Sequence, residues 1–330
     1  MSTLREKAGV LLYDWLPFEW RLRRDWTRIR NRNERLDINP LGVRCDWRWT
    51  SDLRIGLIFP STALRLMRAA FADWPIAFDD ALAEEPTPRV SFLIGHRGRA
   101  RLPHLLRTLE SIAGQRGTSV ECIVVEQSPV REIEEVLPKG VHYIHTPIPA
   151  SLPYCRSWAF NVAARAARGE VLILHDNDTV VPARYAAAAY GAIASGHDFA
   201  NIARFVFYLR NANVTLDEPP ERVVQNTQGV SVIAKRDAYF AIGGYDEAFV
   251  GWGGEDNDFW DRAETLRVHR YGSVPLMHLW HAPQPEKAMG DRAPAVARYR
   301  ELEQQPPEAR IARLTSVDFG RIDRPPSEGG

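Results

Sequence analysis

The chain has 330 residues, 45% of them hydrophobic and 25% charged, which is enough to bury the core of one large domain and a smaller attached segment. Basic and acidic residues balance at 42 each, so the overall charge gives no support for nucleic-acid binding. No stretch reaches the roughly 18 apolar residues of a transmembrane helix, and the cysteines Cys45, Cys122 and Cys155 form no CxxC pair, which favours a reducing compartment, the cytoplasm.

The first 50 residues combine tryptophan with arginine. Such a segment can lie on an anionic membrane surface, here the inner face of the cytoplasmic membrane. It can also be a helical appendage whose tryptophans pack on the rest of the protein, and the interrupting acids Glu19, Asp25 and Glu34 favour that interpretation. The tryptophans concerned are Trp15, Trp20, Trp26, Trp47 and Trp49.

Changes in composition divide the chain into three parts. Leu53–Asp73 begins as an apolar stretch and continues as a predicted helix, and the acidic, proline-containing Asp79–Pro88 is typical of a linker. The predicted parts are a basic, tryptophan-rich helical appendage (1–85), a main domain (86–290), and a C-terminal part (291–330) that is helical with a break at Pro306-Pro307 and then loose.

Short apolar runs alternate with helical patterns in the main domain. Val90–Gly95 is typical of a buried strand, and Leu102–Ala113 carries leucine and isoleucine at helical spacing. This order of strand, helix and strand predicts an α/β fold with a doubly wound, mostly parallel sheet. The other predicted strands are Val120–Glu126, Val141–His145 and Val171–Leu174, the other helices are Trp158–Ala167, Ala183–Ser195 and Glu255–Leu266, and Asn211–Pro220 is expected to be a surface loop.

Two carboxylates follow one of these buried strands, in Asp176-Asn-Asp178. Ligands of open α/β sheets sit just beyond the carboxyl ends of the strands. Hard divalent cations such as Mg²⁺ and Mn²⁺ prefer oxygen ligands and share them with phosphates. A cation here could therefore bridge to the diphosphate of a nucleotide, although the same pattern also occurs in solvated turns.

A second motif places glycine and tryptophan before acids, in Gly251-Trp-Gly-Gly-Glu-Asp256. The glycines allow a tight turn that can approach a ligand, and Trp252 offers a flat apolar face of the kind that packs on a sugar ring. Acids in a first helical turn also complement the helix dipole, so the pattern alone fits an ordinary helix start as well.

Together the two motifs resemble those of a known enzyme family. Gly251 to Asp258, with the stretch back to Gln228, looks like the acceptor-side signature of the β-1,4-galactosyltransferases and the bacterial chondroitin-polymerase-type transferases. Asp176-Asn-Asp178 resembles the metal motif of GT-A transferases, and the resemblance covers about residues 89–285. It implies a GT-A (nucleotide-diphospho-sugar transferase) fold and an inverting transfer of a hexose or N-acetylhexosamine from a UDP-sugar to a carbohydrate acceptor, with Mn²⁺ or Mg²⁺. Galactose or N-acetylgalactosamine is the expected sugar, in bacterial polysaccharide or glycoconjugate synthesis.

The resemblance also implies roles for single residues. Asp256 would be the base that deprotonates the acceptor hydroxyl, and Glu255 would bind the acceptor or orient the loop. Trp252 would pack on sugar, with Gly253 and Gly254 as a hinge. The implied metal ligands are Asp178, Asp176, which also lies near the ribose, His281, which matches the family's histidine best, and His278, at the position of a second ligand.

The implied nucleotide-sugar pocket follows the first strands. Its residues are His96 (stacking on the base), Arg97 and Arg99 (pairing with phosphate), Glu126 (contacting base or ribose), Arg156 and Asn161 (an Arg-then-Asn pattern), and Gly229. Two departures leave the sugar and acceptor open: Val250 stands where the galactosyltransferases have tryptophan, and Asn257 where they have a third acid.

Three alternatives remain. A retaining GT-A enzyme of the polypeptide N-acetylgalactosaminyltransferase type would typically lack the acid at Asp256. A nucleotidyltransferase would need a glycine-rich phosphate loop, and Gly95-His-Arg-Gly98 is a poor one. A membrane-docking scaffold without activity would use the basic N-terminal segment but would leave both motifs unexplained.

Overall fold

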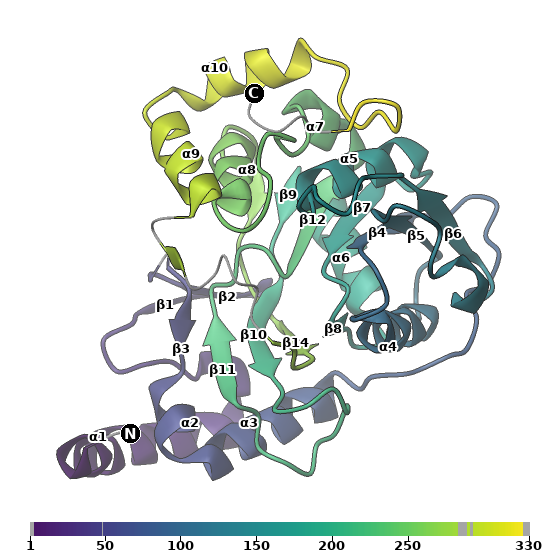
Figure 1. Ribbon diagram of the computed structural model, residues 1–330. Coiled ribbons are helices and arrows are strands. Elements are labelled where there is room, and N and C mark those ends of the chain that lie inside the picture. Colours follow the sequence, from purple (N-terminus) through teal and green to yellow (C-terminus); the bar gives the residue numbers. More distant parts are fainter. Residues whose placement is uncertain (1–2, 48, 283–288, 291–292, 326–330) are drawn as a thin grey trace.

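The computed structural model describes residues 3–47, 49–282, 289–290 and 293–325 (Figure 1). Its centre is a seven-stranded sheet with the strand order β13-β9-β12-β7-β4-β5-β6. The bounds of these strands are β4 (Val90–His96), β5 (Val120–Glu126), β6 (Val141–His145), β7 (Val171–His175), β9 (Phe199–Ala200), β12 (Ser231–Lys235) and β13 (Val268–His269).

The four strands predicted from their apolar runs form the parallel half of this sheet. Strands β7, β4, β5 and β6 are neighbours and all run in the same direction, so their carboxyl ends lie along one edge. Strand β12 pairs antiparallel with β7, opposing Ser231 to His175, and it brings the Gln228 loop to that same edge. The predicted mostly parallel α/β sheet is therefore present.

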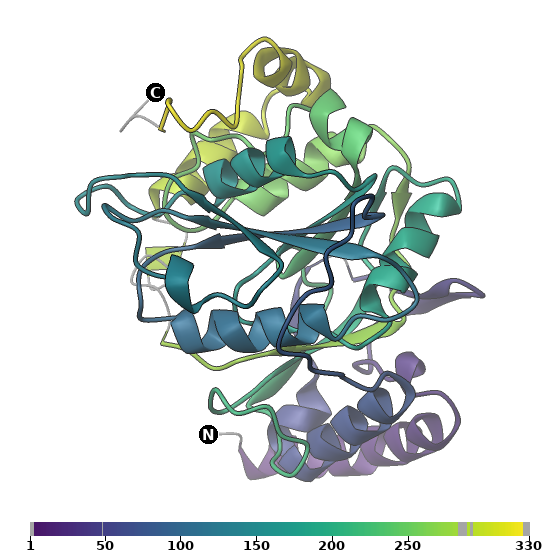
Figure 2. The same cartoon turned by 90° about the vertical axis from the view of Figure 1, so that its right-hand side faces the viewer.

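Helices cover both faces of the sheet because successive strand residues point to opposite sides (Figure 2). Phe92, Val124 and Ile173 pack with helices α4 and α6 in one cluster. Leu93 and Leu172 belong to the cluster on the other face, with helices α5, α7 and α8. The helix bounds are α4 (Leu102–Ala113), α5 (Arg156–Ala166), α6 (Tyr185–Ala194), α7 (Arg236–Ala241) and α8 (Glu255–Ala263).

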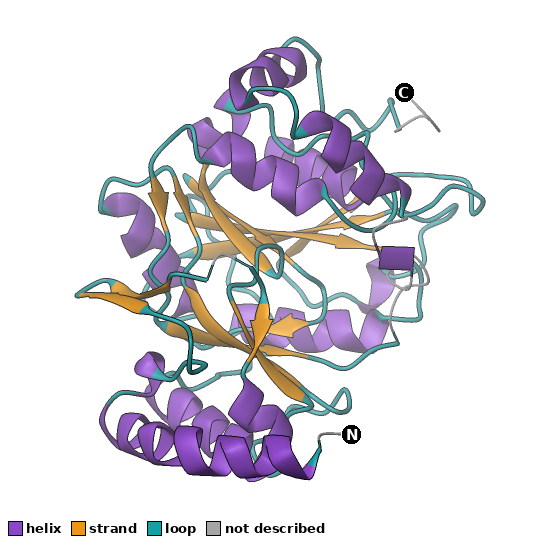
Figure 3. Ribbon diagram, turned by 90° about the vertical axis from the view of Figure 1, so that its left-hand side faces the viewer, coloured by secondary structure: helices purple, strands orange, loops and turns teal. Residues whose placement is uncertain are grey.

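A second, five-stranded sheet, which the sequence patterns did not predict, packs beside the first (Figure 3). Its order is β3-β11-β10-β14-β8, and β10 pairs with β14 in parallel. Two of its strands are only two residues long, too short for a periodicity to show. The bounds are β3 (Ser51–Asp52), β8 (Thr179–Val180), β10 (Ala203–Tyr208), β11 (Arg222–Gln225) and β14 (Val274–His278).

The N-terminal part shares a core with this second sheet. Trp26 is 5% exposed, its ring lies 6.2 Å from that of Phe205, and both belong to the cluster that includes Val10 and Phe18. The part is also less helical than predicted, because strand β3 joins β11 and a hairpin precedes it. Its elements are α1 (Leu4–Arg24), η1 (Trp26–Arg28), β1 (Leu36–Asn39), β2 (Gly42–Cys45), α2 (Arg54–Ile58) and α3 (Pro60–Asp73).

The C-terminal part crosses over α8. Helices α9 (Pro294–Leu302) and α10 (Pro307–Thr315) are separated at the predicted proline break, and both contact α8 (Figure 1). Residues 326–330 of the predicted loose tail lie outside the described residues. A search of the described helices found none with the length and hydrophobicity needed to cross a bilayer. The division into three domains stays a prediction.

Candidate active site

Strand pairing brings the predicted metal ligands together. Asp178 lies in the turn between β7 and β8, and β14 pairs with β8 so that His278 is opposite Thr179. The imidazoles of His278 and His281 approach the Asp178 carboxylate to 3.4 and 3.2 Å, and one ligand atom from each of the three residues fits within 4.8 Å. Asp178 Oδ1 is buried and accepts no hydrogen bond within the described part of the chain, so it retains a lone pair for a cation.

The surroundings prepare these groups to bind a cation. Burial opposes ionisation of Asp178, but His278, His281 and Arg101 outweigh it and hold its pKa well below the usual range. Nδ1 of each histidine lies 2.8 Å from a backbone carbonyl, and Nε2 is the ring nitrogen that faces the Asp178 carboxylate. One carboxylate and two imidazoles are compatible with Mn²⁺.

Arg101 is a residue of this cluster that the sequence analysis passed over. Its guanidinium donates to Asp178 Oδ2 at 3.2 Å and lies 3.1 Å from Nδ1 of His281. The side chain comes from the turn before α4, in the same basic loop as Arg97 and Arg99. If a cation binds the Asp178 carboxylate, the Arg101 guanidinium beside it is placed to pair with a phosphate.

Arg156 joins the two sequence motifs. From the first turn of α5 its Nε donates to Asp176 at 3.0 Å, while one terminal nitrogen donates to Asp256 at 2.8 Å. The other terminal nitrogen also contacts the carbonyl oxygen of Gly229. Burial alone would lower the pKa of Arg156, but Asp176 and Asp256 raise it well above its ordinary value. The arginine is thus fixed as a cation between the two motifs, and Asp176 points to it rather than to the histidines.

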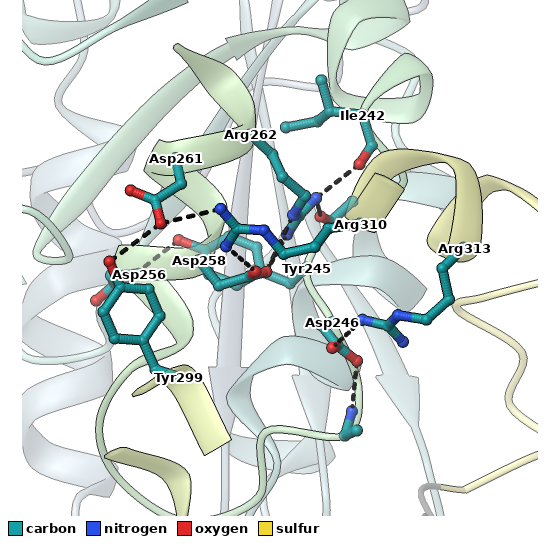
Figure 4. Close-up of polar contacts among 12 residues, drawn as sticks. Ile242, Tyr245, Asp246, Asp256, Asp258, Asp261, Arg262, Tyr299, Arg310 and Arg313 are labelled. Atoms are coloured by element: carbon teal, nitrogen blue, oxygen red, sulfur yellow. Dashed lines mark hydrogen bonds and ion pairs between the residues drawn. The ribbon is translucent and has the colours of Figure 1, made fainter. Parts of the chain in front are cut away.

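Asp256 is held at the start of α8 by three features. Tyr245 donates its hydroxyl to Asp256 Oδ1 at 2.7 Å (Figure 4). Gly229 leaves the space that the carboxylate occupies, because a Cβ there would lie 1.8 Å from Asp256 Oδ2. Gly253 and Gly254 have φ angles of 104° and 85°, the left-handed region that favours glycine, and they set the direction in which α8 begins. One oxygen is therefore anchored, and Oδ2 makes no hydrogen bond among the described residues.

Glu255 and Asp176 are buried close to the negative charge of Asp256, which affects their pKa values. Burial, and then the Asp256 charge, raise the pKa of Glu255 to about 7. Burial also raises the pKa of Asp176 to about 7, against the favourable effect of Arg156. Glu255 accepts a hydrogen bond from the Gly253 amide at 3.0 Å, which ties it to the glycine loop.

The remaining predicted donor residues are only partly gathered at this edge. His96 ends β4, and its Nδ1 lies 2.9 Å from the Asn177 amide, beside the metal motif. Arg97 is bonded to the carbonyl of Leu152, 2.6 Å away, and Arg99 to that of Glu132 at 3.2 Å. Their roles toward a nucleotide stay predictions.

Two predicted donor residues have other tasks in the structure. Asn161 is fully buried and donates to the Tyr245 carbonyl at 2.8 Å, so it holds the loop that carries Tyr245. Glu126 is also fully buried, and it accepts a hydrogen bond from Tyr143 at 2.5 Å. Their predicted roles toward a nucleotide stay predictions, because a strand end or helix position indicates the region of a side chain but not its partner.

Two family models match the chain over this region. "Glycosyl transferase family 2" matches residues 99–245, which include Asp176 and Asp178, and "N-terminal domain of galactosyltransferase" matches residues 218–281, which include Asp256 and both histidines. Over these residues the chain resembles glycosyltransferases of the GT-A fold. This confirms the predicted enzyme class and fold and the resemblance to galactosyltransferases.

Two solved structures illustrate the similarity. The catalytic domain of Drosophila β1,4-galactosyltransferase 7, in complex with xylobiose, has 17% identity and a TM-score of 0.35. The match covers 55% of the present chain and 64% of the Drosophila domain, so the present chain spans less than two thirds of the length of that domain. A mannosyltransferase from Pyrobaculum calidifontis, in complex with GDP-Man and Mn²⁺, has 15% identity and a TM-score of 0.42, with coverages of 78% and 82%. A search of curated proteins gave no match.

Proposed function

We propose that the protein transfers a hexose or N-acetylhexosamine from a UDP-sugar to a carbohydrate hydroxyl, with inversion at the anomeric carbon and with Mn²⁺ or Mg²⁺ bound. The observation that carries this proposal is the position of Arg156 between Asp176 and Asp256. It puts the donor-side and acceptor-side motifs of the sequence within the reach of one side chain, as a single reaction centre requires.

The steps follow from the residues present. Asp256 Oδ2, free of hydrogen bonds among the described residues, takes the proton of the acceptor hydroxyl. The hydroxyl oxygen forms a bond to the anomeric carbon as the bond from that carbon to the diphosphate oxygen breaks, and UDP leaves with the electron pair. A cation held by Asp178, His278 and His281 would supply positive charge for the diphosphate. Arg101, beside those ligands, would pair with a phosphate oxygen.

Inversion is favoured over retention by the acid at position 256. A base beside the acceptor suits direct attack in one displacement, and Tyr245 and Arg156 anchor its other oxygen. Galactose or N-acetylgalactosamine remains our proposed sugar because of the galactosyltransferase match over residues 218–281.

Donor hydrolysis tests this proposal without knowledge of the acceptor. The full chain is incubated with Mn²⁺ and each of UDP-galactose, UDP-N-acetylgalactosamine, UDP-glucose and GDP-mannose, and the released nucleoside diphosphate is measured. We expect release from a UDP-galactose-type donor that stops on chelation of the metal. Release from GDP-mannose alone would contradict the proposed donor, and no release from any of them, with no binding of nucleotide, would contradict the function.

We also propose that α1 attaches the enzyme to an anionic membrane surface. Leu12, Leu16 and Trp20 recur at every fourth residue on the outer side of the helix and are 71%, 74% and 52% exposed. Arg23 and Arg24 follow them in the last turn. An apolar stripe beside arginines is typical of helices that lie in a membrane interface.

Vesicle flotation tests the membrane proposal. The protein should float with vesicles that contain phosphatidylglycerol and not with pure phosphatidylcholine vesicles. Leu12→Ser with Leu16→Ser should abolish flotation, whereas Val130→Ser, at a residue 65% exposed elsewhere, should not change it. Flotation that is equal for the double variant and the wild type would contradict the role of α1.

A further inference from the structure

A pocket opens between the N-terminal hairpin and the loop that precedes β12. The hairpin β1–β2 and the following residues supply one wall, residues 226–228 and β10 supply others, and helix α8 contributes one tryptophan. The lining residues that matter below are Arg44, Trp47, Arg204, Gln228, Trp260 and Arg270.

The described lining residues include three arginines and no carboxylate, so the pocket is positively charged. Arg44 and Arg270 each have an acid nearby but outside the lining: Arg44 is opposite Asp37 in the hairpin, and Arg270 pairs with Glu264. Arg44 and Arg270 could each leave their acid and bind an anion in the pocket at a small cost in free energy, because exposed ion pairs are weak.

Arg204 differs because it is 3% exposed and, among the described residues, is linked to the carboxylate of Glu34 through the side chain of Gln225. It donates to the Gln225 side chain at 2.9 Å and to the carbonyls of Thr27 and Ile29 at 2.6 Å each. These bonds use three of the five N–H groups of a guanidinium. Burial lowers its pKa to about 10. Glu34 and Asp25 offset part of the cost of burying this cation, and an anion in the pocket would offset more of it.

The pocket lies next to the acceptor side of the active site. Gln228 accepts a hydrogen bond from Trp260 Nε1 at 2.9 Å through its carbonyl, and from the Asn257 amide at 3.2 Å through its side chain. The next residue, Gly229, is the one that Asp256 approaches. Asn257 is also where the galactosyltransferases have a third acid, so this departure removes a negative charge next to a positively charged pocket.

Trp47 supplies a face for a sugar ring at the entrance. Its side chain is 50% exposed, and the Asn226 amide holds the Trp47 carbonyl. Asn226 has a φ of 58°, unusual for a residue other than glycine, which places its side chain beneath this segment. Tryptophan, amides and arginines together are suited to a polar ring that carries a charge.

We propose that this pocket is a second acceptor subsite, which binds a sugar residue that carries a negative group, either a carboxylate or a phosphate. The residue would belong to the acceptor chain and lie next to the one whose hydroxyl faces Asp256. This inference rests on the glycosyltransferase function proposed above and adds the substrate class that the motifs leave open.

Calorimetric titration with three short probes tests the proposal. Tri-galacturonate carries carboxylates, its methyl ester has the same size without charge, and a phosphorylated maltotriose carries a phosphate. Each is titrated into the wild type, the Arg44→Gln/Arg270→Gln double variant, and Arg5→Gln, an exposed arginine of α1 that serves as control. UDP with Mn²⁺ is titrated into the same proteins, which also verifies that each variant is folded.

We expect one acidic trimer to bind the wild type about tenfold more tightly than the neutral ester, and the double variant to lose about that factor, the effect of one charge-assisted hydrogen bond. The trimer that binds identifies carboxylate or phosphate. Equal binding of acidic and neutral probes, no binding of either acid, or unchanged binding in the double variant would overturn the subsite, even with normal UDP binding. Acid-selective binding without UDP binding would instead overturn the proposed function and leave the pocket as a saccharide site.

Discussion

Tyr245 and Arg156 both donate hydrogen bonds to Oδ1 of Asp256, so the effect of replacing this residue on activity can be predicted. Asp256→Asn keeps the size of the side chain but cannot accept the acceptor proton, so we expect UDP binding to persist and sugar transfer to fall by about 10²- to 10⁴-fold. Turnover and UDP affinity are measured in parallel, with the exposed Asp237→Asn as control. Turnover within a few-fold of the wild type would refute the role of Asp256 as base.

Glu255 makes the free energy of unfolding depend on pH. Its pKa is raised from 4.5 to about 7 in the folded state, so the folded protein binds more protons than the unfolded chain between these values. The contribution of Glu255 to stability therefore falls as pH rises through this window. Glu255→Gln, which does not titrate, should be more stable than the wild type by about 1–3 kcal/mol at pH 8, with a smaller difference at pH 5.

Denaturant unfolding of the metal-free proteins at both pH values measures this difference. Glu301→Gln, on the outside of α9, is the control and should show no such trend. A difference that is the same at pH 5 and pH 8 would mean that Glu255 does not titrate in this range.

Local sequence could predict which residues carry the site, but not how they pair. Asp178, His278 and His281 meet as expected because their motifs stand at strand ends. Arg101 and Tyr245 were missed because their partners are 77 and 11 residues away in sequence, and the basic loop around Arg101 does not show which of its arginines meets Asp178.

At the scale of elements, α8 is held in place by arginines of its own and of α10 (Figure 4). Asp258 is fully buried and receives hydrogen bonds from Arg262 at 3.0 Å and from Arg310 at 2.8 Å. Arg310 also contacts Asp261 at 3.2 Å. The C-terminal helix thus fixes the helix whose first turn carries Glu255 and Asp256.

Arg310→Met should destabilise the protein by about 3 kcal/mol, because it leaves the Asp258 charge buried with one partner fewer. The double variant Arg310→Met/Asp258→Asn should be destabilised by less than the sum of the two single changes, since it removes the unpaired charge. Chemical unfolding of the four proteins measures this coupling. Additive effects would show that the two side chains do not interact.

The main strands could be predicted from continuous apolar runs, because strands buried on both faces leave that pattern. The second sheet could not, since β3 and β8 have two residues each and gain their order from neighbours distant in the chain. Its strand β14 nevertheless carries His278 and is followed by His281, so two of the three residues of the metal cluster depend on a strand that the sequence patterns did not predict.

At the scale of the whole molecule, the N-terminal part contributes to the hydrophobic core that it shares with the five-stranded sheet. Trp26 packs on Phe205 and donates Nε1–H to Asp73 at 2.8 Å. Trp26→Ala should therefore cost about 3–5 kcal/mol of stability. Trp20→Ala, at a ring 52% exposed, should cost less than about 1 kcal/mol. Similar melting temperatures for the two variants would contradict the place of Trp26 in the core.

The proposed donor site depends most on a cation held by Asp178, His278 and His281. We would measure the melting temperature of the wild type and of Asp178→Ala with UDP, with Mn²⁺, with both, and with UDP plus EDTA. Ligands that bind only the folded state raise the melting temperature. We predict that UDP and Mn²⁺ together raise the melting temperature of the wild type by more than the sum of the shifts that each causes alone. Asp178→Ala should lose this additional shift. Equal shifts in the two proteins, with or without EDTA, would contradict the metal-dependent donor site.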